Sequence, residues 1–273
     1  MRRFASAFAA FVAAVVLPLV LLGGCTRQGP KQAQPAQAGT AVAQDAVAQA
    51  VRRAAPAVVQ VSALAPTGYV TAAGRPIAVR LVGSGFVVDA RGAILTSLRL
   101  VTGARRVEVR SAPMDTPLPV QRIDLDAADG VAVLHVRPAR PLKALPLARR
   151  PAAAGSYVLV LGRQGAAFGV VSAGARGMLV PGGGVRPLLQ TDAPIHAGNV
   201  GGPLIDLSGH VVGMAMLQVA GGRRVAFAVP AQALSQTITR LSREAPRIGR
   251  SRNPHATSIW RHIPPVFKWS VRA

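Results

Sequence analysis

The feature that most constrains the fold of this chain is a long succession of short apolar runs that begins after Pro56. The runs are rich in Val, Leu and Ile, and glycine or proline ends each of them, which is typical of short strands joined by turns. A first set is expected at 58–62, 77–81, 85–88, 93–96, 107–110 and 131–136, and a second at 157–161, 168–172, 188–191, 203–205, 211–217 and 225–228. Two such sets predict an all-β fold of two six-stranded antiparallel barrels.

Apolar residues recur at helical spacing on both sides of the strand runs. This spacing predicts a weak amphipathic helix over 42–54 and a short closing helix over 231–243 that packs on the second barrel. A segment rich in Pro, Arg and Ala, residues 138–154, is expected to connect the two barrels.

The N-terminus has the form of an export signal. A positively charged start is followed by an apolar stretch from Phe4 to Leu22. The sequence Leu22-Gly23-Gly24-Cys25 resembles a bacterial lipobox, in which the cysteine is lipidated and becomes the mature N-terminus. This predicts a lipoprotein signal peptide over 1–24 and a lipid-anchored protein of the bacterial cell envelope that faces the periplasm. Thr26 slightly favours the outer membrane. The alternative to a cleaved, lipidated signal peptide is an uncleaved transmembrane anchor.

The remaining boundaries follow from changes in composition. We expect a disordered linker over 25–40, a domain over 41–243 and a basic tail over 244–273. Within the domain, the first barrel is expected over about 56–137 and the second over about 155–230. The tail holds both tryptophans, so it is either a membrane-surface segment or a simple extension.

The chain is strongly basic, with 32 Lys+Arg against 10 Asp+Glu and a formal charge of +22. Such an excess favours contact with anionic surfaces, although a coding bias toward arginine would also produce it. The arginines are scattered and not gathered with aromatic residues, so a nucleic-acid partner is not expected. The chain has 1 cysteine, which excludes an intramolecular disulfide, and we expect no cofactor and no metal site.

Four stretches resemble motifs of the HtrA (DegP-like) family of trypsin-fold serine proteases. They read GSGFVVDARGAILT over 83–96, DGVAVL over 129–134, QTDAPIHAGNVGGPL over 190–204 and VAFAVP over 225–230. The third is the most specific, and the order and spacing of all four extend the resemblance over about 45–243. The resemblance implies a trypsin-like pair of barrels. The short tail after the closing helix leads us to expect that the family's usual PDZ domain is absent.

The resemblance also places the family's catalytic triad on three residues that cannot perform its chemistry. Arg99 stands at the position of the general base, Gly130 at that of the orienting aspartate and Val200 at that of the nucleophile. A guanidinium accepts no proton, and an isopropyl group has no nucleophilic atom. The neighbouring Asp129 would point to the opposite face of a strand unless a bulge at Gly130 turned it.

The binding elements of the family are expected to persist. The backbone of Gly198, Asn199 and Val200 would present N–H donors to a carbonyl, as an oxyanion hole does, unless the loop is kept only for its turn. The resemblance assigns the walls of an apolar peptide pocket to Ala193, Pro194, Ile195, Met214, Ala215 and Met216.

We therefore expect a pseudoprotease that binds peptides, a partner protein or an anionic envelope surface. The alternative is an active HtrA-like endopeptidase of periplasmic protein quality control that uses non-standard residues. His196, His135, Ser84 and Ser97 form no recognisable nucleophile–base pair in the sequence. Family members often form trimers, so the resemblance leaves both a monomer and an oligomer as alternatives.

Overall fold

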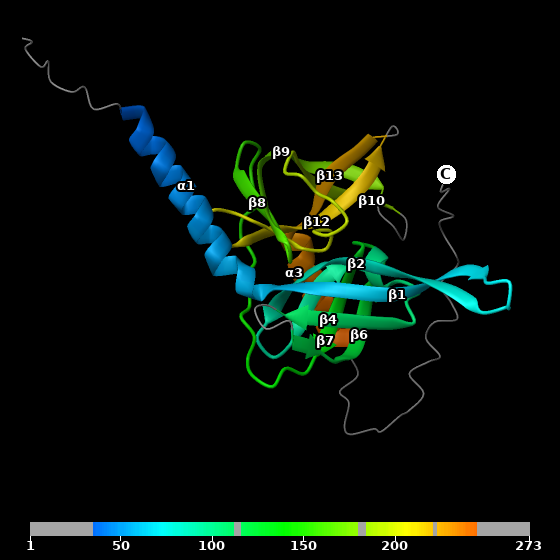
Figure 1. The fold of residues 1–273 in the computed structure, drawn as a ribbon. Coiled ribbons are helices and arrows are strands. Elements are labelled where there is room, and N and C mark those ends of the chain that lie inside the picture. Colours follow the sequence, from blue (N-terminus) through cyan, green and yellow to red (C-terminus); the bar gives the residue numbers. More distant parts are fainter. Residues whose placement is uncertain (1–34, 112–115, 180–183, 221–222, 245–273) are drawn as a thin grey trace, which may run out of the picture. The chain divides into compact units, whose positions relative to one another are not determined.

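The computed structural model describes residues 35–111, 116–179, 184–220 and 223–244 (Figure 1). The predicted signal peptide, Cys25 and the tail beyond Glu244 lie outside the described residues. The chain divides into two compact units, residues 1–42 and 43–273, and the second contains the two sheets. No helix of the described residues has both the length and the apolar character needed to cross a membrane.

The first helix, α1, covers Pro35–Ala54 and so begins within the segment expected to be a linker. The prediction of a helix from residue 42 was too short, because Pro35 suits a first helical turn and the following alanine and glutamine residues are good helix formers. The short helix η1 (Ala55–Ala57) then leads into the first strand.

The first sheet has seven strands in the order β5-β4-β1-β2-β3-β7-β6. Strand β4, beside the edge strand β5, also lies close to β6 at the other edge, so the sheet curls into a nearly closed barrel. Its elements are β1 (Val58–Val70), β2 (Pro76–Asp89), β3 (Ala93–Ser97), the one-turn helix α2 (Leu98–Val101), β4 (Arg106–Ser111), β5 (Thr116–Leu118), β6 (Val120–Asp126) and β7 (Val131–Val136).

The first sheet differs from the prediction in three details, and the first is that it has seven strands where six were expected. The runs 77–81 and 85–88 form one continuous strand, because the glycines between them permit close packing and do not make a turn. A Cβ atom on Gly85 would lie 2.7 Å from the carbonyl oxygen of Leu95 on β3. Strands β5 and β6 were not predicted, because β5 has only three residues and four of the seven residues of β6 are polar or charged.

The second sheet is a closed barrel in the order β10-β13-β12-β11-β8-β9, as the six predicted runs required. Its strands are β8 (Tyr157–Gly162), β9 (Gly165–Leu179), β10 (Val185–Thr191), β11 (Pro203–Ile205), β12 (Val211–Ala220) and β13 (Arg223–Pro230). The predicted all-β class with two barrel-like sheets is therefore confirmed.

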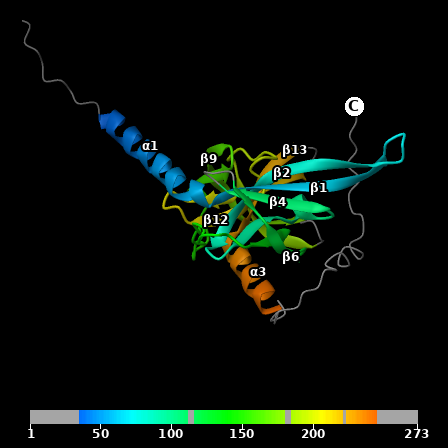
Figure 2. The same ribbon diagram turned by 60° about the horizontal axis from the view of Figure 1, so that its bottom comes forward.

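The closing helix α3 covers Ala231–Glu244, close to the predicted range. Its buried Leu234 and Leu241 join a hydrophobic cluster that also contains Val131 and Leu134 of the first barrel. Figure 2 shows α3 beside β6, and Thr237 of α3 donates a hydrogen bond to Asp126 at the end of that strand at 2.5 Å. The helix thus ties both barrels together, whereas the sequence predicted contact with the second alone.

Candidate functional site

The three positions that correspond to a catalytic triad lie together at the junction of the barrels. Arg99 is in α2, Gly130 precedes β7, and Val200 lies in the loop between β10 and β11. The backbone N–H of Leu98 donates to the carbonyl oxygen of Gly130 at 2.9 Å, which joins α2 to the start of β7. The N–H of Ser84 on β2 donates to the carbonyl oxygen of Val200 at 2.9 Å, which holds the loop against the first barrel.

Arg99 is exposed and reaches from the first barrel to the second. Its Nη1 donates to the carbonyl oxygen of Leu217 on β12, over 3.5 Å. A guanidinium stays protonated at physiological pH and has no acceptor atom, so this side chain offers a fixed positive charge and donors to the junction.

Gly130 adopts φ +69°, and the carboxylate beside it is bound elsewhere. Asp129 accepts a hydrogen bond from Thr237 Oγ1 of α3 at 3.1 Å and pairs with Arg186 Nε of β10 at 3.3 Å. The described contacts of Asp129 therefore give it a role in joining α3 and β10 to the first barrel.

The loop from Pro194 to Gly202 is held in shape by a buried asparagine. Asn199, only 3% exposed, accepts a hydrogen bond at Oδ1 from the N–H of His196 at 2.8 Å. Its Nδ2 donates to the carbonyl oxygen of Pro194 at 3.0 Å. These two bonds fold the residues before Val200 into a compact turn.

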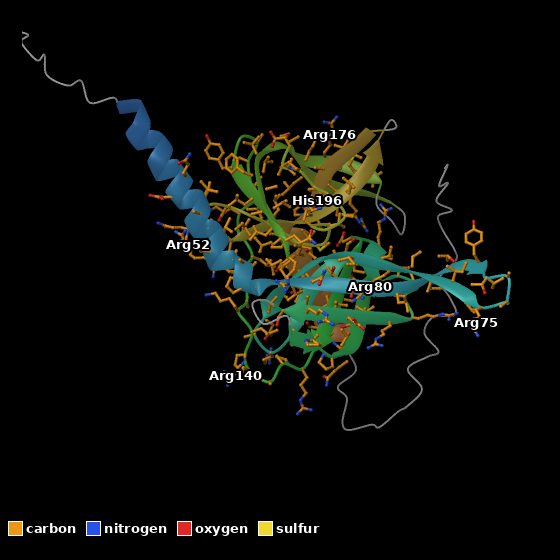
Figure 3. The ribbon with its side chains drawn as sticks, in the orientation of Figure 1. Arg52, Arg75, Arg80, Arg140, Arg176 and His196 are labelled. Atoms are coloured by element: carbon orange, nitrogen blue, oxygen red, sulfur yellow. The ribbon has the colours of Figure 1, made fainter. Side chains whose placement is uncertain are left out.

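The turn engages the N–H groups that were expected to be available to a ligand. Gly198 N–H donates to Nδ1 of the His196 ring at 3.1 Å, and Val200 N–H donates to the carbonyl oxygen of His196, also at 3.1 Å. The ring nitrogen acts as the acceptor, so Nδ1 carries no proton in this arrangement. Both N–H groups are therefore engaged within the loop in this structure. Figure 3 shows His196 in the region between the barrels.

Ser84 of the Gly-Ser-Gly-Phe motif holds the same loop from the first barrel. Its fully buried hydroxyl donates to the carbonyl oxygen of Gly198 at 2.7 Å and accepts from the N–H of Arg163 at 3.3 Å. The contact requires close backbone approach, since a Cβ on Gly201 would lie 2.4 Å from the carbonyl oxygen of Ser84. The sequence contained the motif, but nothing in it linked the hydroxyl to a loop more than a hundred residues away.

The predicted apolar pocket is not open. Ala193, Met214, Ala215 and Met216 are all buried within the hydrophobic core, while Pro194 is exposed and Ile195 half-buried. Side chains alternate along β12, so Met214 and Met216 join one hydrophobic cluster and Ala215 the other. The more enclosed of the two cavities described, about 360 Å³, lies instead between α3, β10 and the turn before β7.

The two other histidines of the described residues contact carboxylates. His135 Nε2 lies 2.8 Å from Oδ2 of Asp124, and His210 Nδ1 lies 3.8 Å from Oδ1 of Asp206. Within the part of the chain that the structure describes, no group of three or more His, Cys, Asp or Glu side chains is arranged to hold a metal ion.

Comparisons with known proteins agree with this geometry. Residues 83–214 match the trypsin-like peptidase domain. The serine protease HTRA2, mitochondrial, of Bos taurus is 34% identical over 203 residues, which cover 71% of this chain and 43% of that protein. The serine endoprotease DegS of Escherichia coli (strain K12) is 31% identical over 207 residues, covering 71% of this chain and 57% of DegS.

The putative protease Do-like 14 of Arabidopsis thaliana is 31% identical over 213 residues, covering 71% of this chain and 47% of that protein. The chain thus spans about half the length of these relatives. The two sheets, the Gly-rich loop between β10 and β11 and the matched domain agree with one another. The chain belongs to the HtrA-like family of trypsin-fold serine proteases.

Proposed function

We propose that this protein is a catalytically inactive HtrA-like homologue, a pseudoprotease that acts in the bacterial cell envelope by binding. The observation that carries the proposal is the state of the loop at Val200. Acyl transfer by this fold needs a nucleophile, a base and N–H donors for the oxyanion. Val200 and Arg99 cannot supply the first two, and His196 engages the N–H groups of Gly198 and Val200.

A displaced nucleophile–base pair finds no support among the described contacts. The Ser84 hydroxyl is buried and donates to a backbone carbonyl, and His196 accepts from a backbone N–H. The similarity to proteins named serine proteases therefore supports a trypsin-like fold. The residues at the site support a protein that binds without cleaving.

Because the predicted pocket is filled by core side chains, the binding surface is expected to lie on the outside of the barrels. A protein partner or an anionic envelope surface fits such a site better than an extended peptide in a cleft. The charge of +22 gives long-range attraction to either, provided that the partner is acidic.

The envelope location rests on the lipobox-like sequence that ends at Cys25. Cells that produce the protein and receive a tagged fatty acid should label it, and Cys25→Ser should abolish the label. An unlabelled wild-type protein recovered in the soluble fraction would show that the anchor does not exist.

The inactivity is tested by incubating the purified chain with unfolded casein and, separately, with a fluorophosphonate probe. Neither cleavage nor labelling above background is expected. A contaminating protease is distinguished by the Asn199→Pro variant, which disrupts the loop of this protein alone. Turnover that persists through repurification and disappears in that variant would overturn the proposal.

A further inference from the structure

We propose that the segment joining the two barrels carries a cationic strip that lies against the anionic headgroups of a phospholipid bilayer. The strip consists of the side chains of Arg137, Arg140, Lys143, Arg149 and Arg150. The proposal rests on the envelope location proposed above and specifies the surface that the domain turns toward the membrane.

The backbone of this segment is fixed to both barrels. The N–H of Leu142 donates to the carbonyl oxygen of Ala90 on the first barrel at 2.9 Å. On the second barrel, the N–H of Ala148 donates to the carbonyl oxygen of Val211 at 2.8 Å, and the N–H of Val211 donates back to the carbonyl oxygen of Pro146 at 2.9 Å. The backbone that carries the charges is therefore ordered before any ligand arrives, which lowers the entropic cost of binding.

The side chains of the segment divide into an inner apolar set and an outer basic set. Leu145 is buried, and Leu142 and Leu147 are half-buried against the hydrophobic core. All five cations are exposed, and Figure 3 shows Arg140 at the outer edge of the segment. Because the leucines face the core, the basic side chains lie in solvent along the whole segment.

The positive charge of the strip is not compensated. None of its five side chains makes an ion pair or a hydrogen bond with any residue that the structure describes, and the sequence has no acidic residue between Asp129 and Asp192. The neighbouring Asp89 is paired with Arg91 at 2.7 Å. Asp206, near the second-barrel end, accepts the N–H groups of Ser208 and His210, both at 2.9 Å.

A further cation extends the strip toward α1. Arg53, in the last turn of α1, donates from Nη2 to the carbonyl oxygen of Leu207 at 3.1 Å. Leu207 lies in the turn that precedes Val211, to which the backbone of the segment is bonded at Pro146 and Ala148. The strip therefore continues into the helix that leads back along the chain toward Cys25, the expected point of lipid attachment.

Lipid headgroups fit this surface better than nucleic acid or one acidic side chain. The segment contains no aromatic residue on which bases could stack, and none of its residues lines either of the two described cavities. Cations spread along an extended exposed segment match a planar array of phosphates, to which each basic residue contributes separately.

The test measures cosedimentation of residues 25–273, the chain expected after removal of the signal peptide, with phospholipid vesicles. Cys25→Ser is included so that no acyl chain contributes to binding. One vesicle preparation is phosphatidylcholine alone, and the other contains about 30% phosphatidylglycerol. The strip variant replaces all five cations with glutamine. The matched control replaces five other exposed arginines with glutamine: Arg75, Arg105, Arg106, Arg176 and Arg243. Both variants therefore lose the same formal charge and keep the same tail.

We expect the parent chain to prefer the anionic vesicles. The strip variant should bind them at least about tenfold more weakly, while the control stays within about threefold of the parent. Equal losses in both variants would show that net charge alone acts, and an absent preference for anionic vesicles would also overturn the proposal. Tighter, strip-dependent binding to duplex DNA than to anionic vesicles would assign the strip to a different polyanion. None of these results depends on acylation of Cys25 or on proteolytic inactivity. A failure of the proposed function can therefore be distinguished from a failure of the strip proposal.

Discussion

The backbone N–H of Gly198 donates a hydrogen bond to Nδ1 of the His196 ring at 3.1 Å. One side chain of the loop thereby takes up a donor that a bound carbonyl would need. The carbonyl oxygen of the same histidine accepts from Val200, so a single residue engages the loop through both its side chain and its backbone. This relationship limits the catalytic activity that restoring the triad side chains can recover.

Restoring the three triad side chains alone should give only slow reaction with a fluorophosphonate probe. The variant Arg99→His, Gly130→Asp, Val200→Ser regains a nucleophile and a base, and aspartate tolerates a positive φ better than most residues. Adding His196→Ala frees the N–H of Gly198, and one oxyanion donor is worth about 100-fold in rate. The quadruple variant should therefore react with a fluorophosphonate probe roughly 100-fold faster than the triple variant, as measured by labelling kinetics.

His210→Ala added to the triple variant is the matched control, because that histidine lies beside Asp206 and outside the loop. Its labelling rate should equal that of the triple variant. Rapid labelling of the triple variant itself would mean that His196 does not restrict the donors.

Ser84→Ala should loosen the loop that Ser84 holds. The substitution leaves the carbonyl of Gly198 and the N–H of Arg163 without their hydroxyl partner in a buried site. The free energy of unfolding in urea should fall by about 1–2 kcal/mol, and amide hydrogen exchange should accelerate in residues 198–202. The exposed Ser172→Ala serves as control and should change neither quantity. Unaltered exchange in the loop would remove Ser84 from this role.

Asp126 should be the main polar link between the first barrel and α3. Its carboxylate is 2% exposed and bonds with Thr237 and Arg240 of the helix. Asp126→Ala should lower the free energy of unfolding by about 3 kcal/mol, because it removes a buried carboxylate that accepts from the helix and from the backbone N–H groups of Ala128 and Asp129. Thermal and urea denaturation measure the change, and exposed Asp45→Ala should alter it by less than about 0.5 kcal/mol.

If the link acts as one unit, Asp126→Ala and Thr237→Val combined should cost clearly less than the sum of the separate losses. Strict additivity would indicate that the carboxylate and the hydroxyl stabilise the helix independently.

Asp89 should titrate at unusually low pH because of its neighbour. Hydrogen bonds from the Arg91 side chain and backbone lower the pKa of Asp89 from 3.8 to about 2. A lowered pKa in the folded state stabilises the protein above about pH 4, and this contribution is lost as the pH falls toward 2. Arg91→Ala should raise the pKa of Asp89 toward 3.8 in a carboxyl NMR titration. Arg75→Ala should leave it unchanged, and a pKa that stays near 2 without Arg91 would refute the assignment.

The sequence by itself determined the class of fold and the atoms available at the site. All six strands of the second barrel and the closing helix follow from apolar periodicity, because one face of each element is buried. The identity of Val200 and Arg99 is enough to remove a hydroxyl nucleophile and a proton acceptor from those positions, whatever the fold.

The elements that escaped prediction are those whose stability comes from neighbours distant in the chain. Strand β6 alternates charged residues with Ile123 and Leu125, and it is ordered by pairing with β7, where Asp124 meets His135. The long strand β2 continues through its glycines because β3 approaches there so closely that a side chain would not fit.

Only the tertiary structure decided whether the loop and the pocket are open. The N–H donors of Gly198 and Val200 are engaged because Asn199 and Ser84 fold the loop so that His196 faces them. Met214 and Met216 are buried because β12 turns them into the core shared by the barrels. The pocket depends on the packing of strands that are far apart in the sequence, and the loop depends on Ser84 as well as on bonds among its own side chains and backbone. Local periodicity encodes neither.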